Sequence, residues 1–550
     1  MIFKKDFVNL LEEIADILEF KGENPFKVNA FRNGANAIRK LDDDVIFLVK
    51  NKQLDTIKGI GKGIQSVIYE FIENESSPFL DELKKDYPHT LFDLFSIRGL
   101  GPKKISLLFN QLKISSIEDL ETACKNNSLQ DLKGFGKSTQ DKIIAEIEQL
   151  RKNKKFIHLH RVDKIVKTIS EKLLQINPIK NFEISGEYRR NCEVISKLEF
   201  ILLTEKKDEL LTELSGSFVG KIEDSVFIIE DLSIPVNFYL VQNQDDFNKN
   251  QFLVTGSSEF LNSIGTIEDE FFLSDEHTMF EKMKINYLAP EMRELEIVNF
   301  PNRKLIQTSD LIQEKFKGFL HFHTKNSDGM NSLEEMVEAA NRYGFSYFAV
   351  CDHSKTAFYA SGLTEERILL QKKEVEDVSL KLKLPVFQGI ESDILNNGSL
   401  DYDLDFFQNI DFVVASIHSN FNMKEEEMTE RIIKAVENPN TNVLGHPTGR
   451  LLLYRDAYRV DIRKVIDACS RNNVAIEINA NPHRLDLDWR MIMYARDKGC
   501  TFAINPDAHS TEEVKYTKYG IMVARKAGLQ SSEVLNCFSL EDFKSFIKKK

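Results

Sequence analysis

Short apolar runs recur from about residue 318 onward, and each is followed by a segment with helical periodicity. The runs are FLHFHT, YFAVCDHS, VFQGIESDI, FVVASIHS, NVLGHPTG, VAIEINA and TFAINPDAHS. Intervening segments such as SLEEMVEAANRYG and IRKVIDACSRN carry apolar residues at helical spacing. A strand followed by a helix, repeated about seven times, predicts a parallel α/β barrel. In such barrels the reactive residues lie at the C-terminal ends of the strands.

The preceding 300 residues follow two other patterns. Up to about residue 150 the pattern is helical and is interrupted by three similar turns, IKGIGK at 57–62, IRGLGP at 97–102 and LKGFGK at 132–137. From about 155 to 300, strand-like runs such as LEFILLT and VNFYLVQ alternate with helical stretches. The basic run at 151–155 indicates a boundary between these regions, and PNRK at 301–304 indicates a second.

Composition narrows the class of protein. The 550 residues are 42% hydrophobic, with a formal net charge of −13. Such a chain can bury several cores. Its net negative charge does not attract nucleic acid, so contact with DNA would need local binding motifs. The six cysteines lie far apart without a CxxC, which argues against a disulfide framework or a zinc ribbon. Acidic residues interrupt the N-terminal apolar stretch, and the apolar runs are short, so we expect a cytoplasmic protein without membrane contact.

Six of the eleven histidines end the barrel runs, with carboxylates beside them. Because residues two apart on a strand face the same side, we expect His321 and His323 to point together. Closure of the strands would bring all six to one mouth, where mixed imidazole and carboxylate ligands suit zinc, manganese or iron. Asp352 is a candidate for positioning a ligand rather than binding metal. His483 and the four remaining histidines (His89, His158, His160, His277) are interpreted as structural.

The motifs LHFHT, DHS, GIESDIL, VASIHS, GHPTGR and DAHS, over about residues 315–550, resemble the polymerase and histidinol phosphatase (PHP) domain. The resemblance implies a distorted (β/α)7 barrel that binds three divalent metals, manganese and/or zinc or iron, and hydrolyses phosphate esters. Among the ligands, His321, His323, Glu391, Asp507 and His509 are predicted to act in catalysis. The nine ligands that the resemblance implies are His321, His323, Asp328, His353, Glu391, His418, His446, Asp507 and His509.

Two arginines near the barrel mouth are candidates for phosphate binding. Arg450 stands in GHPTGR and Arg484 in NPHR. A guanidinium can hold two phosphate oxygens at once. A structural ion pair is the alternative for each.

The three glycine-containing turns resemble helix-hairpin-helix motifs. Glycine permits the positive φ that a tight hairpin requires and lets backbone N–H groups approach a phosphate. The following helix N-terminus adds positive potential, and lysines add charge. We therefore predict salt-sensitive, sequence-independent DNA binding. The predicted DNA-binding residues are Gly59, Gly61, Lys62, Gly99, Gly101, Lys103, Gly134, Gly136 and Lys137.

The middle region resembles the palm and thumb of family X DNA polymerases, through GEYRR at 186–190 and TGS at 255–257. Segment 21–38 resembles that family's N-terminal lyase-type domain. With the hairpins and the barrel, the chain resembles the bacterial form of family X that carries a C-terminal PHP domain. The fold class is then multidomain: helical, α+β, then barrel. The expected domains are a lyase-type domain with the first hairpin (1–80), a hairpin region (81–153), a palm (154–242), a thumb (243–303) and a PHP barrel (315–550).

The palm departs from that family where three aspartates are expected. The matching positions hold Lys197, Glu199 and Asn237, whose charges cancel, which disfavours the paired Mg²⁺ ions of nucleotide transfer. Glu187 adds a negative charge where the family has a serine beside the triphosphate. We therefore predict loss of polymerase activity, with a shifted alignment or rescue by Glu193 as alternatives. Near Val67, where the family has its lyase lysine, no lysine occurs, so we expect little lyase activity.

The leading hypothesis is a DNA-processing protein whose barrel acts as a 3′-5′ exonuclease or a 3′-end-processing enzyme in DNA repair. The expected partner is DNA, gapped, single-stranded or at 3′ ends, and the expected state is a monomer. The alternatives are a gap-filling polymerase of base excision repair with proofreading, a DNA-binding scaffold with idle metals, and a small-molecule phosphatase. The three hairpins argue against the last, because a metabolite enzyme has no use for them.

Overall fold

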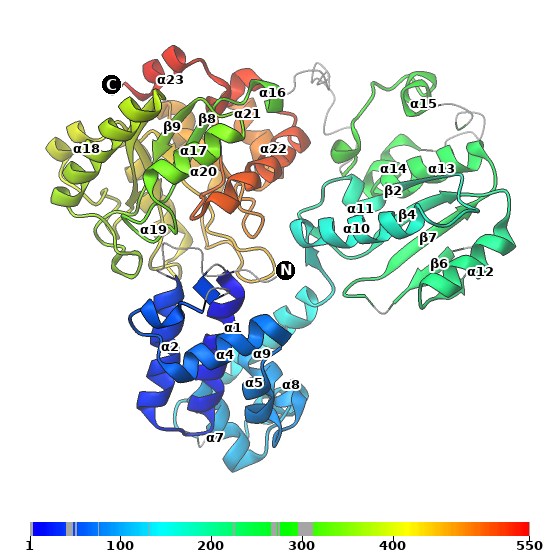
Figure 1. The fold of residues 1–550 in the computed structure, drawn as a ribbon. Coiled ribbons are helices and arrows are strands. Elements are labelled where there is room, and N and C mark those ends of the chain that lie inside the picture. Colours follow the sequence, from blue (N-terminus) through cyan, green and yellow to red (C-terminus); the bar gives the residue numbers. More distant parts are fainter. Residues whose placement is uncertain are drawn as a thin grey trace. The chain divides into compact units, whose positions relative to one another are not determined.

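The computed structural model describes residues 4–39, 48–49, 52–74, 76–130, 132–223, 226–230, 232–265, 272, 275–294 and 312–548. The chain divides into two compact units, Met1–Lys154 and Lys155–Lys550 (Figure 1). The division falls within the basic run at 151–155. The boundary expected at 301–304 and parts of the expected thumb lie outside the described residues.

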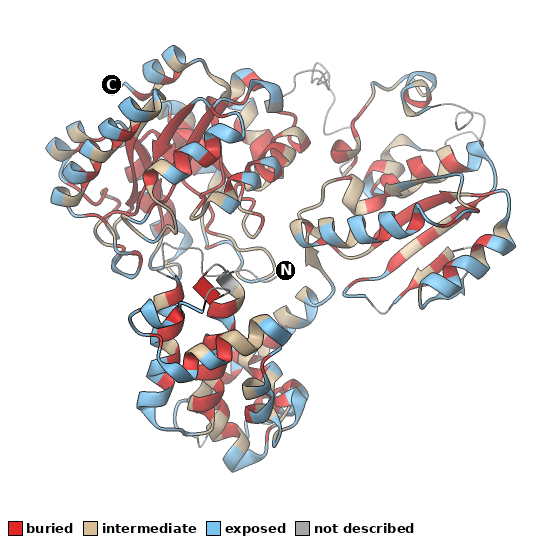
Figure 2. Cartoon of the chain, viewed as in Figure 1, coloured by how far each residue is buried: buried red, intermediate tan, exposed pale blue. Residues whose placement is uncertain are grey.

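The first unit is helical because its apolar residues recur at helical spacing. Helix α1 (Lys4–Phe20), for example, buries Phe7, Leu11, Ile14 and Leu18 along one face (Figure 2). Three helices begin directly after the glycine-containing turns, at Lys62, Pro102 and Lys137 in α4, α7 and α9. The helices are α1, α2 (Pro25–Arg39), α4 (Lys62–Asn74), α5 (Pro78–Lys84), α6 (His89–Phe92), α7 (Pro102–Leu112), α8 (Ile117–Lys125) and α9 (Lys137–Asn153).

The palm-like part of the second unit is a five-stranded sheet in the order β2-β4-β7-β6-β5, with helices packed on it (Figure 1). Strands β4 and β7 run parallel, and Phe200 and Phe238 share a core with helix α10. The strands are β1 (Ile157–His158), β2 (Asn181–Ser185), β3 (Val194–Ile195), β4 (Leu198–Leu203), β5 (Lys221–Glu223), β6 (Val226–Ile229) and β7 (Val236–Val241). The helices are α10 (Leu159–Leu173), α11 (Gly186–Arg189), α12 (Lys207–Ser217), α13 (Gln244–Thr255), α14 (Ser258–Ile264) and α15 (Glu276–Lys282).

The C-terminal part confirms the predicted barrel. Seven parallel strands neighbour one another in chain order, and a bridge between Phe322 and Ala508 nearly closes the ring. The strands are buried on both faces, as expected for a parallel sheet covered by helices (Figure 2). The strands are β8 (Gly318–Phe322), β9 (Tyr347–Val350), β10 (Val386–Asp393), β11 (Phe412–Ser416), β12 (Val443–Leu444), β13 (Ala475–Asn479) and β14 (Phe502–Asn505).

Helices follow the strands along the chain, as the sequence pattern predicts. None of the helices within the described ranges is long and apolar enough to cross a membrane. The helices are α16 (Ile312–Lys315), α17 (Leu333–Arg342), α18 (Glu365–Leu382), α19 (Glu425–Val436), α20 (Ile462–Asn472), α21 (Trp489–Asp497), α22 (Thr517–Lys526) and α23 (Leu540–Ile547).

A buried ion pair joins the barrel to the palm-like part. The Lys526 ammonium, at the end of α22, is 1% exposed and lies 3.0 Å from Glu294 Oε1. It also donates to the Arg190 carbonyl at 3.2 Å, and the Arg190 guanidinium donates to Glu294 at 3.0 Å. Burial opposes ionisation of Glu294, but the two cations outweigh it and lower the Glu294 pKa to about 2. The two parts also share one apolar core.

A second ion-pair network links helix α15 to helix α11, beside the five-stranded sheet. Glu276 Oε1 accepts from Arg189 at 2.7 Å and from Arg293 at 2.8 Å. Arg293 is fully buried, with its guanidinium carbon about 5 Å from the Phe280 ring centre. Burial opposes the charge of Glu276, yet the two arginines lower its pKa to about 2.

Substitution Glu276→Gln should destabilise this network by about 3 kcal/mol, because it leaves the buried Arg293 charge uncompensated. Hydrogen exchange of α13 and α15 should accelerate accordingly. In the unsubstituted protein, the stabilisation is present above the unfolded pKa of about 4.5 and should be lost as pH falls toward 2. Glu281→Gln, at an exposed position of the same helix, is the control. Equal exchange in both variants would contradict the assignment.

Candidate metal centre

Three of the predicted ligands sit on backbone of unusual conformation. His321 has φ of 59° and Asp507 has φ of 53°, and His446 has φ of 22°. Residues other than glycine rarely adopt positive φ, and such strain gathers at functional sites. The register between β8 and β9 shifts at Leu320/Phe322, so His321 occupies a bulge. The His321 and His323 rings do lie together, 5.3 Å apart, but through this bulge rather than through plain strand alternation.

The structure brings the nine predicted ligands to one mouth of the barrel. Three groups offer donor atoms that lie within 4.8 Å of one another. His446, which is outside these groups, places Nε2 3.0 Å from Glu391 Oε1. The groups are His323, Asp328, His353 and His509; His321, His323 and Asp507; and His353, Glu391 and His418.

Three further carboxylates orient these side chains and loops. Glu477, on β13, accepts from His321 Nδ1 at 2.6 Å and from the His446 backbone N–H at 2.7 Å. Asp393 holds His418 Nδ1 at 2.6 Å. Asp352 accepts from the Thr324 N–H at 2.7 Å and from its hydroxyl at 2.6 Å, so it fixes the loop after β8, as a positioning residue would.

Glu477 was missed by the sequence analysis. It lies inside the apolar run VAIEINA, where a single acidic residue reads as an ordinary strand position. The available signal was its place two residues before Asn479 on a strand that is otherwise apolar. A fully buried glutamate on such a strand requires partners, and its carboxylate has them in His321, His446, Asn479 and Asn505.

The donor set fits divalent cations. His321 Nε2, His323 Nδ1, His446 Nδ1 and Glu391 Oε2 are buried, and within the described part of the chain they make no hydrogen bond. Buried polar atoms without partners are rare and destabilising, and bound cations would satisfy them. Imidazole nitrogens and carboxylate oxygens are ligands that zinc, manganese and iron accept. The site is thus chemically suited to bind metal.

Burial and the close neighbouring charges determine which side chains of the ligand cluster are ionised. Burial, together with the neighbouring His509 and His353, lowers the His323 pKa to about 3, so this imidazole is neutral and able to bind a cation. Burial disfavours the charged form of His418, but Glu391 and Asp393 outweigh it and raise its pKa to about 10. Burial likewise opposes ionisation of Asp507, yet His321 and His323 hold its pKa well below the usual range. Carboxylates at the centre are therefore ionised.

The two arginines predicted to bind phosphate have different surroundings. Arg484 Nε lies 3.9 Å from Asp507 Oδ2, beside the ligand cluster. Arg450 instead pairs with Asp488 at 2.6 Å and donates to the Arg484 carbonyl at 3.0 Å. These contacts correspond to a structural ion pair, the alternative to phosphate binding. The His483 ring stacks edge-on against His158 and His160, with centroids 4.7 and 4.8 Å away, outside the ligand groups.

The three hairpins of the first unit share one backbone geometry. Gly59, Gly99 and Gly134 have φ of 101°, 82° and 92°, as a tight turn between two helices requires. The second glycines, Gly61, Gly101 and Gly136, lie just before the helices that start at Lys62, Pro102 and Lys137. Space for a side chain at these second glycines is open. The hairpins thus present helix N-termini and backbone amides at an accessible surface.

At the five-stranded sheet, two of the three predicted polymerase positions, Lys197 and Glu199, form an ion pair. Glu199 and Asn237 lie opposite each other on β4 and β7. The Lys197 ammonium is 2.7 Å from Glu199 Oε1, and the Tyr239 hydroxyl donates to the same atom at 3.0 Å. Glu187 accepts from the Ser196 N–H at 2.6 Å. Glu193, the alternative carboxylate, lies 3.7 Å from Arg450.

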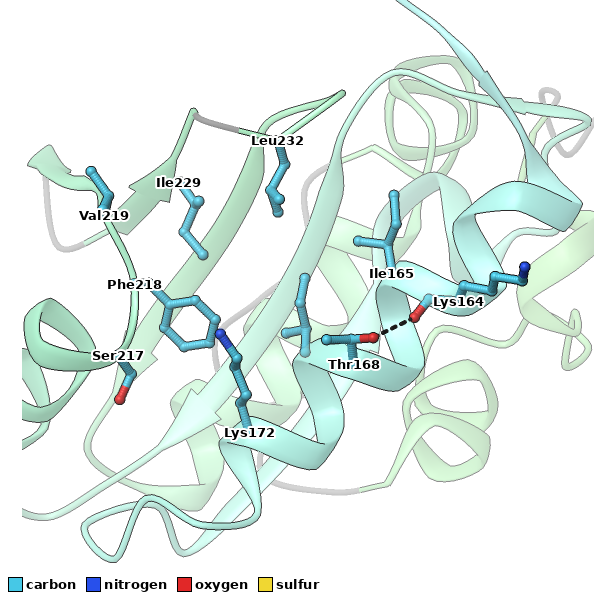
Figure 3. A pocket seen from close by; sticks show the side chains of 10 residues that line it. Lys164, Ile165, Thr168, Lys172, Ser217, Phe218, Val219, Ile229 and Leu232 are labelled. Carbon is cyan, nitrogen blue, oxygen red and sulfur yellow. Dashed lines mark hydrogen bonds between the residues drawn. The ribbon is translucent and has the colours of Figure 1, made fainter. Parts of the chain in front are cut away.

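The opposite face of this sheet carries an apolar hollow of about 450 Å³ (Figure 3). Ile229 pairs with Val236, which pairs with Leu198, so these residues face away from Glu199. Lys172 lies over the Phe218 ring, 5.1 Å from its centre. The hollow is therefore on the face of the sheet away from Glu199.

In the first unit, the position expected for a lyase nucleophile is apolar and buried. Val67, on α4, is 4% exposed. A cavity of about 610 Å³ lies beside it, lined by Lys27 and by glycines of the first hairpin. Lys27 belongs to α2, not to the helix expected to carry the nucleophile.

Comparisons with known proteins agree with this arrangement. Residues 3–77 match the helix-hairpin-helix domain, 92–149 the SAM-like helix-hairpin-helix tandem, and 320–481 the PHP domain. A protein of Bacillus subtilis (strain 168), "DNA polymerase/3'-5' exonuclease PolX", is 35% identical over 99% of both chains. A "Probable phosphatase" of Acetivibrio thermocellus is 25% identical over 43% of this chain and 97% of its own. A "Probable phosphatase" of Thermoanaerobacter sp. (strain X514) is 25% identical over 42% and 94%.

Replacement of Glu477 by Gln should weaken divalent metal binding about 10- to 100-fold, the usual effect of losing a partner that orients a ligand. The amide keeps one acceptor but turns a donor toward groups that themselves donate, so His321 loses its fixed orientation. Calorimetric titration of Mn²⁺ into metal-free protein measures the change. Glu512→Gln, at an exposed position after β14, is the control. Unchanged affinity in Glu477→Gln, with intact circular dichroism, would refute the role.

Proposed function

This chain belongs to the family of the DNA polymerase/3′-5′ exonuclease PolX, and from this premise we propose that its barrel removes nucleotides from DNA 3′ ends. The observation that carries the proposal is the convergence of nine side chains able to bind metal at one barrel mouth. Several of their buried nitrogen and oxygen atoms make no hydrogen bond among the described residues. The barrel is a metal-dependent hydrolase domain of the PHP type. Processing of 3′ ends in DNA repair is the biological setting that fits both.

We assign the nine side chains as the ligands of three divalent ions, manganese, zinc or iron. Ions bound there would make water nucleophilic at neutral pH and neutralise charge on a phosphodiester. The chain's own residues prepare the site: Glu477 aims His321, Asp393 aims His418, and the neutral His323 offers a lone pair. Arg484, beside Asp507, is placed to bind a phosphate oxygen. We assign a role in catalysis to five of these ligands, His321, His323, Glu391, Asp507 and His509.

The helix-hairpin-helix motifs supply the grip on DNA. Backbone amides and helix N-termini hold phosphates without adding to net charge, which is how a chain of net charge −13 can bind a polyanion. We propose that residues 1–80 and 81–153 bind gapped or single-stranded DNA. In this proposal 154–242 form a palm, 243–303 form a thumb and 315–550 form the hydrolase. The chain acts as a cytoplasmic monomer.

We further propose that the palm no longer polymerises. Support comes from the Lys197 ammonium, which lies where the family needs a carboxylate and pairs with Glu199. An ammonium 2.7 Å from this carboxylate competes with any Mg²⁺ there. The name of the Bacillus subtilis relative includes a DNA polymerase, so a polymerase, as in the gap-filling alternative, is the second candidate function. The "Probable phosphatase" relatives match the barrel but cover less than half of this chain, and the hairpins favour DNA over a small ester.

Alanine at both His321 and His323 should abolish manganese-dependent shortening of a 5′-end-labelled oligonucleotide. The two imidazoles supply two of the three donors in one ligand group, and His323 also belongs to a second group, so their loss disrupts both groups. A loss of at least 1,000-fold in rate is expected for removal of a metal centre worth several kcal/mol. His277→Ala is the control, since that exposed imidazole stacks on Tyr287 away from the cluster. Equal shortening by the double variant would exclude the barrel as the nuclease.

The wild-type protein should show no templated primer extension with Mg²⁺ and dNTPs. The combined change Lys197→Asp, Glu199→Asp and Asn237→Asp should create a measurable signal, because it places three carboxylates on and beside the paired strands β4 and β7. A variant that also carries the His321 and His323 alanines keeps nuclease activity from hiding extended products. Extension by the unsubstituted protein would overturn the inactive palm.

A further inference from the structure

Two aromatic side chains beside the ligand cluster face solvent. Phe358 is 86% exposed and Tyr359 is 71% exposed, on a short turn between β9 and α18. The Tyr359 ring centre lies 6.2 Å from the ring centre of His353, a predicted ligand. Neighbouring exposed aromatics at a cleft are unfavourable in water and mark binding surfaces.

The turn that carries Tyr359 is held firmly from below. The Thr356 N–H donates to Asp401 at 2.7 Å, and the Thr356 hydroxyl lies 2.8 Å from Asp393. Ala357 and Ala360, on either side of the two aromatics, are buried. A side chain at Gly362 would meet the Ser354 carbonyl oxygen at 1.9 Å, so the backbone of the loop packs directly against Ser354. Tyr359 is thus a pre-organised platform, which reduces the entropy lost on binding.

Tyr359 forms one wall of a cavity of about 600 Å³, within the range of small-molecule sites. His418 and Asp393 form the wall toward the ligand cluster, and Asn396, Asn397 and Ser419 add amide and hydroxyl groups. The described residues that line it include neither lysine nor arginine. The imidazole among them, His418, is already paired with Asp393 at 2.6 Å. A phosphate chain would therefore meet a carboxylate and no unpaired cation, whereas an uncharged base and sugar would meet an aromatic face and hydrogen-bonding groups.

We propose that this cavity binds the terminal nucleoside of an unpaired DNA 3′ end, with its base stacked on Tyr359. The adjacent phosphodiester would then reach the ligand cluster. Stacking needs a base released from its pair, as at a single-stranded or frayed 3′ end. The inference rests on the proposed nuclease function and adds the residue that holds the terminal base. Tyr359 acts in it as a substrate-binding residue.

The test compares Tyr359→Ala, Tyr359→Phe and the wild type on two 5′-labelled single strands, one with an ordinary 3′-terminal nucleotide and one with an abasic 3′-terminal residue. Tyr359→Ala should raise KM for the ordinary strand about tenfold, the size expected for one lost stacking contact. Tyr359→Phe should stay near wild type, because it keeps the aromatic face. For the wild type, KM on the abasic strand should be higher than on the ordinary strand by a similar factor. For Tyr359→Ala, KM should be the same on both strands.

Tyr343→Ala is the matched control, because Tyr343 is 59% exposed at the end of α17 and does not line the cavity. The effect of the substitution and the effect of the missing base on KM should not add to each other. If they multiply when Tyr359→Ala acts on the abasic strand, the base does not contact Tyr359 and the inference fails. It fails equally if Tyr359→Ala matches wild type on the ordinary strand. A wild type that hydrolyses a small phosphomonoester but neither strand would instead overturn the proposed function.

Discussion

Three carboxylates and six imidazoles share one barrel mouth, and most are shielded from water. Charges in such surroundings are tolerated only when each has a partner of fixed geometry. That constraint explains the supporting features: Glu477 behind His321, Asp393 behind His418, and positive φ at His321 and Asp507. The barrel strands can bury their apolar faces without help, but several buried nitrogen and oxygen atoms make no hydrogen bond among the described residues, and a bound cation would satisfy them.

Much of this arrangement follows from the sequence. The rhythm of apolar runs predicts seven parallel strands, and their histidines converge because parallel strands share one C-terminal end. The bulge at His321 could not be predicted, since alternation alone places His321 and His323 on one face. Glu477 was missed because its partner lies 156 residues away. The surroundings of Arg450 depend on Asp488, which no motif marks.

The palm-like region shows what a substitution pattern can and cannot reveal. The charges of Lys197, Glu199 and Asn237 indicate a weakened cation site, and their residue types alone carry that argument. The direct contact between Lys197 and Glu199 required the structure, because a lysine just before a strand has many rotamers. The apolar hollow behind the sheet (Figure 3) likewise arises from residues that are distant in the chain.

The buried Lys526 gives the palm-like region a reason to persist that is independent of nucleotide chemistry. Its ammonium belongs to the barrel helix α22, whereas its acid, Glu294, and its carbonyl partner, Arg190, belong to the neighbouring part. A lineage that discarded the palm would strand this cation in apolar surroundings and would need to replace it at the same time. Substitutions elsewhere in the sheet that leave Glu294 and Arg190 in place avoid that double step.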